Sequence, residues 1–245
     1  MLKLMSVELL KIRRSLALLM MFAAPLIVVL FCTMMMVKQV DLATLTSKRW
    51  AGYWMGNTAL WAYFMQPMYI ALIAGLLNGQ EHRNQSWRLM LTLPVSQAQL
   101  FMAKALLAWL FVLASNMVLV GGSVLAVGML GAFGAPLAGA FAYPDPALVF
   151  KLSLACLPVI VIQHAVAWRF QNLVLPLAVG VMATMGITQV GGSEYWVWYP
   201  WTYPLMAVNG SAADMQQHAL LLAAGVGALL FGVGSAWLGR REVAA

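Results

Sequence analysis

Several uncharged apolar runs in this chain are as long as a lipid bilayer is thick, and they constrain the fold more than any other feature. Residues 16–37 contain no charged side chain, and a helix of about 20 apolar residues spans the roughly 30 Å hydrocarbon core of a bilayer. Only 9% of all residues are charged, against about 25% in soluble domains. We therefore expect an all-α, polytopic membrane protein. Its six transmembrane helices are expected at about residues 16–37, 58–78, 100–130, 148–168, 173–189 and 218–238.

The basic residues predict how these spans are oriented. Six spans place ten basic residues on the side of both termini and four on the other side. The richer side is cytoplasmic by the positive-inside rule, so we expect a multi-pass protein of the cytoplasmic (inner) membrane with both termini in the cytoplasm. The apolar run at residues 16–37 is longer than the roughly 7–15 apolar residues of a signal peptide. We therefore expect it to be a retained first span.

Residues 1–15 predict an amphipathic interfacial helix. Apolar side chains recur on one face, and the other face carries Lys3, Glu8, Lys11 and Arg14. A basic amphipathic helix before a span lies in the cytoplasmic headgroup region, where its lysines approach anionic lipids. Membrane lipids are therefore expected partners of this helix. It serves either as a topogenic signal or as a brace against a cytoplasmic partner.

The chain lacks the motifs of an enzyme or of a nucleotide-binding protein. It contains no GxxxxGK[ST] loop and no HExxH motif, and its histidines are widely spaced. Its positive charges lie at the ends of apolar runs and not in an aromatic-lined groove, which argues against nucleic-acid binding. Ionisable residues are almost absent at mid-bilayer depth, although ion-coupled pumps need them there. We expect no catalytic residue, no metal site and no cofactor bound by this chain.

Residues 79–99 are the most polar internal stretch and are expected on the cytoplasmic side. A short apolar run at Leu89–Leu93 ends at Pro94, and Ser96 is the predicted N-cap of the following helix. Lys104, near the start of that helix, is expected to reach the interface by snorkelling. A short helix lying on the membrane face would act as a lever for a moving partner. The alternative is an ordinary cytoplasmic loop.

This stretch resembles the first cytoplasmic loop of type 2 ABC export permeases. The resemblance rests on Glu81, Trp87-Arg88-Leu89, Thr92-Leu93-Pro94-Val95-Ser96 and Lys104, and on Glu8-Leu9-Leu10-Lys11 in the opening helix. Gln97 stands where the family commonly has an arginine. The layout of six spans, with an aromatic segment before the last, also agrees. Within the family the chain looks most similar to the small bacterial permeases of the lantibiotic-immunity and bacitracin-resistance groups.

The resemblance implies a division of labour between subunits. A separate cytoplasmic ABC ATPase would bind ATP and Mg, and this chain would pair with a second permease, either a copy in a homodimer or a paralogue. A coupling segment at residues 81–93 would transmit the motion of the ATPase. The implied coupling residues are Glu81, His82, Arg83, Trp87, Arg88, Leu89, Thr92 and Pro94.

The resemblance also implies a substrate path along the second and fifth spans. The candidate residues are Trp61, Phe64, Gln66, Met68, Met182, Met185 and Thr188. A wall rich in methionine and aromatic side chains suits an amphipathic or hydrophobic cargo, such as a peptide, a lipid-like molecule or a drug. The alternative is that these side chains pack against neighbouring helices or lipid.

Two further functions stay open at this point. One is a membrane anchor for an ATPase in a maturation or sensing complex, and the other is an intramembrane enzyme. An enzyme would depend on Glu81, His82 and His164, whereas in an exporter Glu81→Ala would uncouple ATP hydrolysis from transport. The exporter and the anchor are separated by whether reconstituted vesicles transport a cargo.

Overall fold

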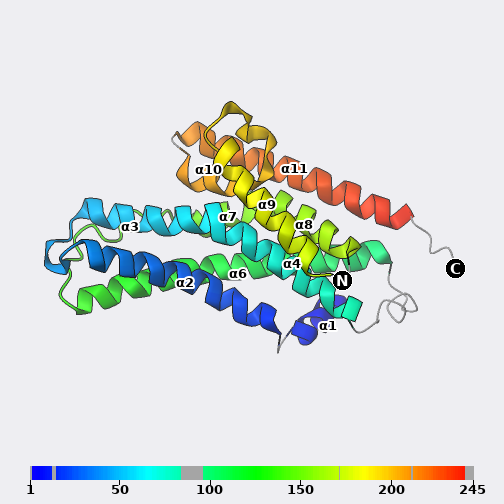
Figure 1. The fold of residues 1–245 in the computed structure, drawn as a ribbon, viewed down its shortest axis with the longest axis horizontal. Helices are drawn as coiled ribbons and strands as arrows, with labels where there is room; N and C mark the ends of the chain where they lie inside the picture. Colours follow the sequence, from blue (N-terminus) through cyan, green and yellow to red (C-terminus); the bar gives the residue numbers. More distant parts are fainter. Residues whose placement is uncertain (1, 13–14, 84–95, 171, 211, 241–245) are drawn as a thin grey trace.

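The computed structural model describes residues 2–12, 15–83, 96–170, 172–210 and 212–240, and all regular elements in those ranges are helical. In chain order they are α1 (Leu2–Ile12), α2 (Leu16–Gln39), η1 (Leu42–Thr44), α3 (Ser47–Leu60), η2 (Trp61–Met65), α4 (Gln66–Arg83), α6 (Gln97–Ala132), α7 (Leu148–Ala155), α8 (Leu157–Arg169), α9 (Val174–Val190), η3 (Glu194–Trp198), η4 (Pro200–Thr202), α10 (Tyr203–Asn209) and α11 (Ala213–Arg240). They form one elongated bundle (Figure 1).

The two ends of the bundle carry different elements. The helix α1, the end of α4, the beginning of α6 and the end of α11 lie at one end, which we call the α1 end (right in Figure 1). The α2–α3 connection and the end of α6 lie at the opposite end, which we call the far end. In the predicted orientation the α1 end faces the cytoplasm.

The outer helices expose apolar surface that suits contact with lipid. Buried residues make up 22% of the most apolar stretch of α2 and 17% of that of α11, and soluble proteins rarely expose patches of this kind. Within the described ranges, four helices are long and apolar enough to cross a membrane, or five if α7 and α8 form one bent span. The all-α polytopic membrane fold is therefore confirmed. The count of six spans remains a prediction, because α9 has only 17 residues.

The second apolar segment belongs to a longer helix than the sequence predicted. The elements α3, η2 and α4 follow one another without a break from Ser47, so the loop expected at residues 38–57 was wrong from Ser47 onward. The π-helical turn η2 ends two residues before Pro67, which has no N–H for the carbonyl four residues earlier. In the widened turn the Gln66 N–H bonds the Trp61 carbonyl. Such turns often mark functional sites inside helices.

Tertiary contacts explain why α3 is helical despite its polar and aromatic composition. The Trp50 indole donates to the Pro136 carbonyl at 2.9 Å, and the Trp54 indole donates to the Ala140 carbonyl at 2.8 Å. Both acceptors lie in the α6–α7 connection, far away along the chain. The contacts that favour this helix are therefore invisible in its local sequence.

The span predicted at residues 148–168 is two helices instead of one. The helices α7 and α8 meet at Cys156 with a bend of 43°. Pro158 follows the break directly, and it lacks the N–H that would bond the Leu154 carbonyl. Because proline is also favourable in the first turn of a helix, it starts α8 as readily as it ends α7.

A side chain of α8 enters the backbone hydrogen-bond ladder of α9. With its amide oriented to satisfy both partners, Gln163 donates to the Pro176 carbonyl at 3.3 Å and accepts from the Gly180 N–H at 3.2 Å. In an undisturbed α-helix those two backbone groups would bond each other. Gly180 also permits α4 to approach, since a Cβ at this position would collide with the Ala71 Cβ.

We expect Gly180→Ala to lower the free energy of unfolding by about 1–3 kcal/mol, because the added methyl group overpacks the contact between α9 and α4. The control is Gly232→Ala in α11, where an added Cβ meets nothing within 4 Å. Thermal unfolding of the purified protein in detergent micelles measures both variants. Equal effects of the two substitutions would contradict the close contact at Gly180.

The aromatic segment before the last helix is partly core. Trp201 and Tyr203 are buried, whereas Tyr195 and Trp198 are 62% and 83% exposed. Trp201 belongs to the main apolar core, and Tyr203 packs with Trp196 and Met206. The exposed rings suit the headgroup region, where amphipathic aromatic side chains concentrate.

Candidate functional site

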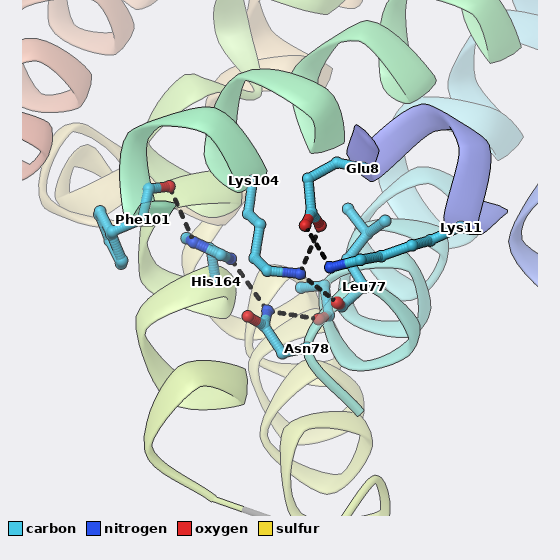
Figure 2. A network of polar contacts seen from close by, with 8 residues as sticks. Glu8, Lys11, Leu77, Asn78, Phe101, Lys104 and His164 are labelled. Carbon is cyan, nitrogen blue, oxygen red and sulfur yellow. Dashed lines mark hydrogen bonds and ion pairs between the residues drawn. The ribbon is translucent and has the colours of Figure 1, made fainter. Parts of the chain in front are cut away.

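A buried lysine lies at the centre of a group of charges at the α1 end (Figure 2). The Nζ atom of Lys104, in α6, lies 2.7 Å from a carboxylate oxygen of Glu8 in α1. It also donates to the Leu77 carbonyl in α4 at 2.8 Å. The other carboxylate oxygen accepts from Lys11 at 2.7 Å. We call Glu8, Lys11, Leu77 and Lys104 the ion-pair cluster, and it joins α1, α4 and α6.

The start of α6 is fixed by its own sequence, and this sets the position of Lys104. Ser96 Oγ accepts from the Gln99 N–H at 3.2 Å, and Gln99 Oε1 accepts from the Ser96 N–H at 3.1 Å. This reciprocal pair is a capping box, with Ser96 as the N-cap, as the sequence predicted. Lys104 follows about two turns later, at 3.6 residues per turn.

The charges of the cluster point into the bundle and not toward headgroups. Glu8 is 1% exposed and Lys104 is 0% exposed, whereas Leu9 and Leu10 are 48% and 67% exposed. The expectation that Lys104 snorkels to the interface was therefore wrong. Each buried charge has an oppositely charged partner, which compensates its lost hydration, and the apolar side of α1 is left to contact lipid.

The pKa of the Glu8 carboxyl lies below its ordinary value. Burial by itself raises this pKa, but the charge and hydrogen bond of Lys104 and the contact with Lys11 outweigh burial. A carboxyl with a lowered pKa in the folded state stabilises the fold above its unfolded-state pKa, and the contribution is lost as the pH falls through the folded-state pKa. Glu8 is therefore ionised at neutral pH.

A second set of polar contacts adjoins the ion-pair cluster (Figure 2). Asn78 Nδ2 donates to His164 Nδ1 at 3.0 Å, and His164 Nε2 lies 3.2 Å from the Phe101 carbonyl oxygen. Because an amide nitrogen donates and a carbonyl accepts, these partners assign a neutral His164 with its proton on Nε2. Both ring nitrogens are thus engaged in joining α8 to α4 and α6.

These contacts lie on the two helices that flank the predicted coupling segment. The helix α4 ends at Arg83, and α6 begins at Gln97. Glu81, His82 and Arg83 form the last turn of α4, of which the backbone alone is described. The other predicted residues of the coupling segment and of the opening helix lie outside the described residues or have no described side chain: Trp87, Arg88, Leu89, Thr92, Pro94, Arg14 and Lys3. Their roles stay predictions.

A separate buried polar network crosses the middle of the bundle. The side-chain oxygen of Asn116, in α6, accepts from the Trp61 indole at 2.8 Å and from the Gln66 amide at 3.0 Å. Its amide nitrogen donates to Ser153 Oγ in α7 at 3.0 Å. The Trp109 indole adds a bond to the Ser153 carbonyl at 3.0 Å. This Asn116 network holds the π turn of η2 against α6 and α7.

The predicted substrate path divides into buried and exposed residues. Trp61 and Gln66 are fully buried in the Asn116 network, and Phe64 and Met68 are half-buried. The exposed members are Met182, Met185 and Thr188, all from α9. The α9 residues alone present an open surface, and their part in transport stays a prediction.

Sequence reasoning missed Asn116 and Ser153. Each is a polar residue inside an apolar run of the sequence, and such residues generally face the bundle interior and find partners there. That position in an apolar run was the available signal. It could mark the two residues as inward-facing, but it could not show that they bond each other.

The matched family model is that of the ABC-2 family transporter proteins, and it covers residues 4–187, about three quarters of the chain. The match includes the ion-pair cluster and the Asn116 network. No curated protein and no solved structure matches the chain significantly. Membrane subunits of this family work in transport and generally act with an ATPase subunit. The chain therefore belongs to the ABC-2 family of transporter proteins, as a membrane permease subunit of an ABC transporter.

Proposed function

We propose that this permease belongs to an exporter of the cytoplasmic membrane that moves an amphipathic or hydrophobic compound outward. A separate cytoplasmic ATPase binds ATP and Mg and supplies the energy, and a second permease subunit completes the complex. Family membership supports the permease role and the need for an ATPase. The resemblance to the lantibiotic-immunity and bacitracin-resistance groups supports a peptide or lipid-like cargo.

The observation that carries the proposal is the ion-pair cluster. Lys104 binds Glu8 and the Leu77 carbonyl together, so α1, α4 and α6 are fastened to one another next to the coupling segment at residues 81–93. A force applied there reaches α4 and α6 together, because separating them breaks the buried hydrogen bond from Lys104 to the Leu77 carbonyl. Separating α1 from α6 would break the buried ion pair. An ATPase beneath the α1 end would therefore displace a stiff group of helices.

The exposed residues of α9 support a transport surface between two permeases. Met182 is 66% exposed and Met185 is 44% exposed, and methionine side chains adapt to cargo of varied shape. In a pair of permeases this surface would border the cargo path. Lipid contact alone is the competing explanation for these exposed side chains.

Glu81→Ala is expected to reduce ATP-driven transport by roughly tenfold, within the range typical of coupling between distant sites, while the ATPase still co-purifies. The reason is that the resemblance assigns Glu81 to the coupling segment, which begins in the last turn of α4, so the substitution removes a charge expected at the contact with the ATPase. ATP hydrolysis and cargo efflux are measured together in reconstituted vesicles.

The matched control is Glu194→Ala, an exposed acidic residue in η3, which should leave transport unchanged. Transport that continues in vesicles without any ATPase would sink the exporter proposal. A complex that hydrolyses ATP but moves none of the peptide, lipid-like or drug probes would favour the anchor alternative.

A further inference from the structure

A groove opens between α2 and α3 at the far end of the bundle. It has a volume of about 590 Å³, within the roughly 300–1,000 Å³ of small-molecule sites. Phe31, Cys32 and Met35 of α2 form an apolar wall on one side. The opposite side is the first half of α3. The groove shares no residue with the ion-pair cluster or with the Asn116 network.

Two glycines leave the floor of this groove free. Gly52 and Gly56 lie one turn apart on α3 and both line the groove, and a Cβ added at either position would meet nothing within 4 Å. These glycines are therefore not required for close packing between the described helices of this chain. Their effect is to keep open space beside the apolar wall of α2.

The rim of the groove is basic. Lys48 and Arg49 both line it and are exposed, and neither makes an ion pair within the described part of the chain. They lie in the first turn of α3, near the level at which α2 ends at Gln39. In the predicted orientation this side of the membrane carries few basic residues. An adjacent basic pair is therefore unexpected here on a surface that binds nothing.

The groove opens sideways toward lipid. Phe31 and Met35, which form its apolar wall, are 53% and 41% exposed, and α2 buries few of its residues in the bundle. A ligand could therefore enter from the bilayer without crossing the protein. Its apolar part would lie deep against α2, and its anionic part would lie at the basic rim.

We propose that this groove binds an acidic phospholipid, with an acyl chain along Phe31 and Met35 and the phosphate between Lys48 and Arg49. The apolar wall excludes a purely water-soluble anion, and the unpaired cations favour an acidic headgroup over a zwitterionic one. The site does not depend on the proposed export function. It would fix α2 to α3 in whichever complex the chain joins.

Native mass spectrometry of the purified full chain in micelles of mixed phosphatidylglycerol and phosphatidylcholine tests the proposal. The wild-type protein should retain phosphatidylglycerol in preference. Lys48→Gln with Arg49→Gln should weaken that preference by about fivefold for each cation removed, or roughly 30-fold in total. Lys151→Gln, which removes a cation already paired with Asp145, is the charge control and should keep the preference.

A second variant tests the apolar part of the groove. Gly52→Leu places a side chain on the open floor, where an added Cβ meets nothing within 4 Å, and should reduce retention of both lipids, whereas Gly128→Leu, on an equally open position of α6, should not. Thermal unfolding checks that both variants are folded. Retention of phosphatidylglycerol by the double charge variant at the wild-type level would overturn the proposal. The proposal would also be overturned if inorganic phosphate alone protected the wild type against thermal unfolding as well as phosphatidylglycerol does. That result would indicate a site for a soluble anion.

Discussion

Replacing Lys104 with methionine is expected to lower the free energy of unfolding by about 3–5 kcal/mol, because Glu8 would keep a buried charge without its main partner. Lys104 is fully buried and lies 2.7 Å from the carboxylate. Lys11 would remain beside Glu8, but its side chain is 30% exposed, so water weakens its attraction to the carboxylate. Unfolding in mixed detergent micelles, followed by circular dichroism, measures the loss.

The matched control for this effect is Lys151→Met at the far end. Lys151 pairs with Asp145 at 2.6 Å, but the two side chains are 24% and 41% exposed, so its loss should cost about 0–1 kcal/mol. Adding Glu8→Gln to Lys104→Met removes both charges and should restore much of the stability. If Lys104→Met were no more harmful than Lys151→Met, the buried pair would not hold α1 to the bundle.

Asn116→Leu is expected to destabilise the protein by about 2–5 kcal/mol, since it removes three side-chain hydrogen bonds that are each worth roughly 0.6–1.7 kcal/mol within a membrane. Trp61, Gln66 and Ser153 would all lose a partner. The leucine would also place an apolar group against their buried polar atoms. The same unfolding measurement applies, and a shift in indole fluorescence would report the change around Trp61.

The neighbouring Ser115→Ala provides the comparison for Asn116→Leu. Ser115 is equally buried, but its hydroxyl donates to the Val112 carbonyl of its own helix at 2.8 Å, and Tyr69 is its partner on α4. Its loss should therefore cost much less than the loss of the three bonds of Asn116. If both substitutions gave the same small effect, the network between helices would contribute nothing to the fold, and the π turn would have to be held by apolar packing.

The outer helices could be predicted from the sequence because their environment is simple. The residues of α2 are apolar all round, and lipid accepts such a helix in any rotation, so the length of the run gave its position. The helix α3 was missed because Trp50 and Trp54 make it look like an interfacial loop. Their indoles donate to carbonyls in the α6–α7 connection, and a local sequence pattern cannot predict those distant partners.

The ion-pair cluster shows the same limit for a functional site. Glu8 and Lys104 are 96 positions apart, and each has a reasonable solitary explanation, as part of a polar helix face and as a snorkelling side chain. A local sequence pattern considers one charge at a time, and burial of a single charge is unfavourable. Both Glu8 and Lys104 are therefore expected at the surface. The family, by contrast, was recognisable from short motifs around residues 81–104 and 8–11, since these preserve residue types without requiring their spatial arrangement.

The amide of Gln163, set between the Pro176 carbonyl and the Gly180 N–H, has a mechanical consequence. Shearing α8 past α9 would leave the Gln163 amide without partners in hydrocarbon, where each unsatisfied polar group costs several kcal/mol. The two helices should therefore travel as one rigid hairpin through any cycle of opening and closing. Any bending of the bundle therefore has to occur where this hairpin meets its neighbours, above all at the 43° bend between α7 and α8 at Cys156.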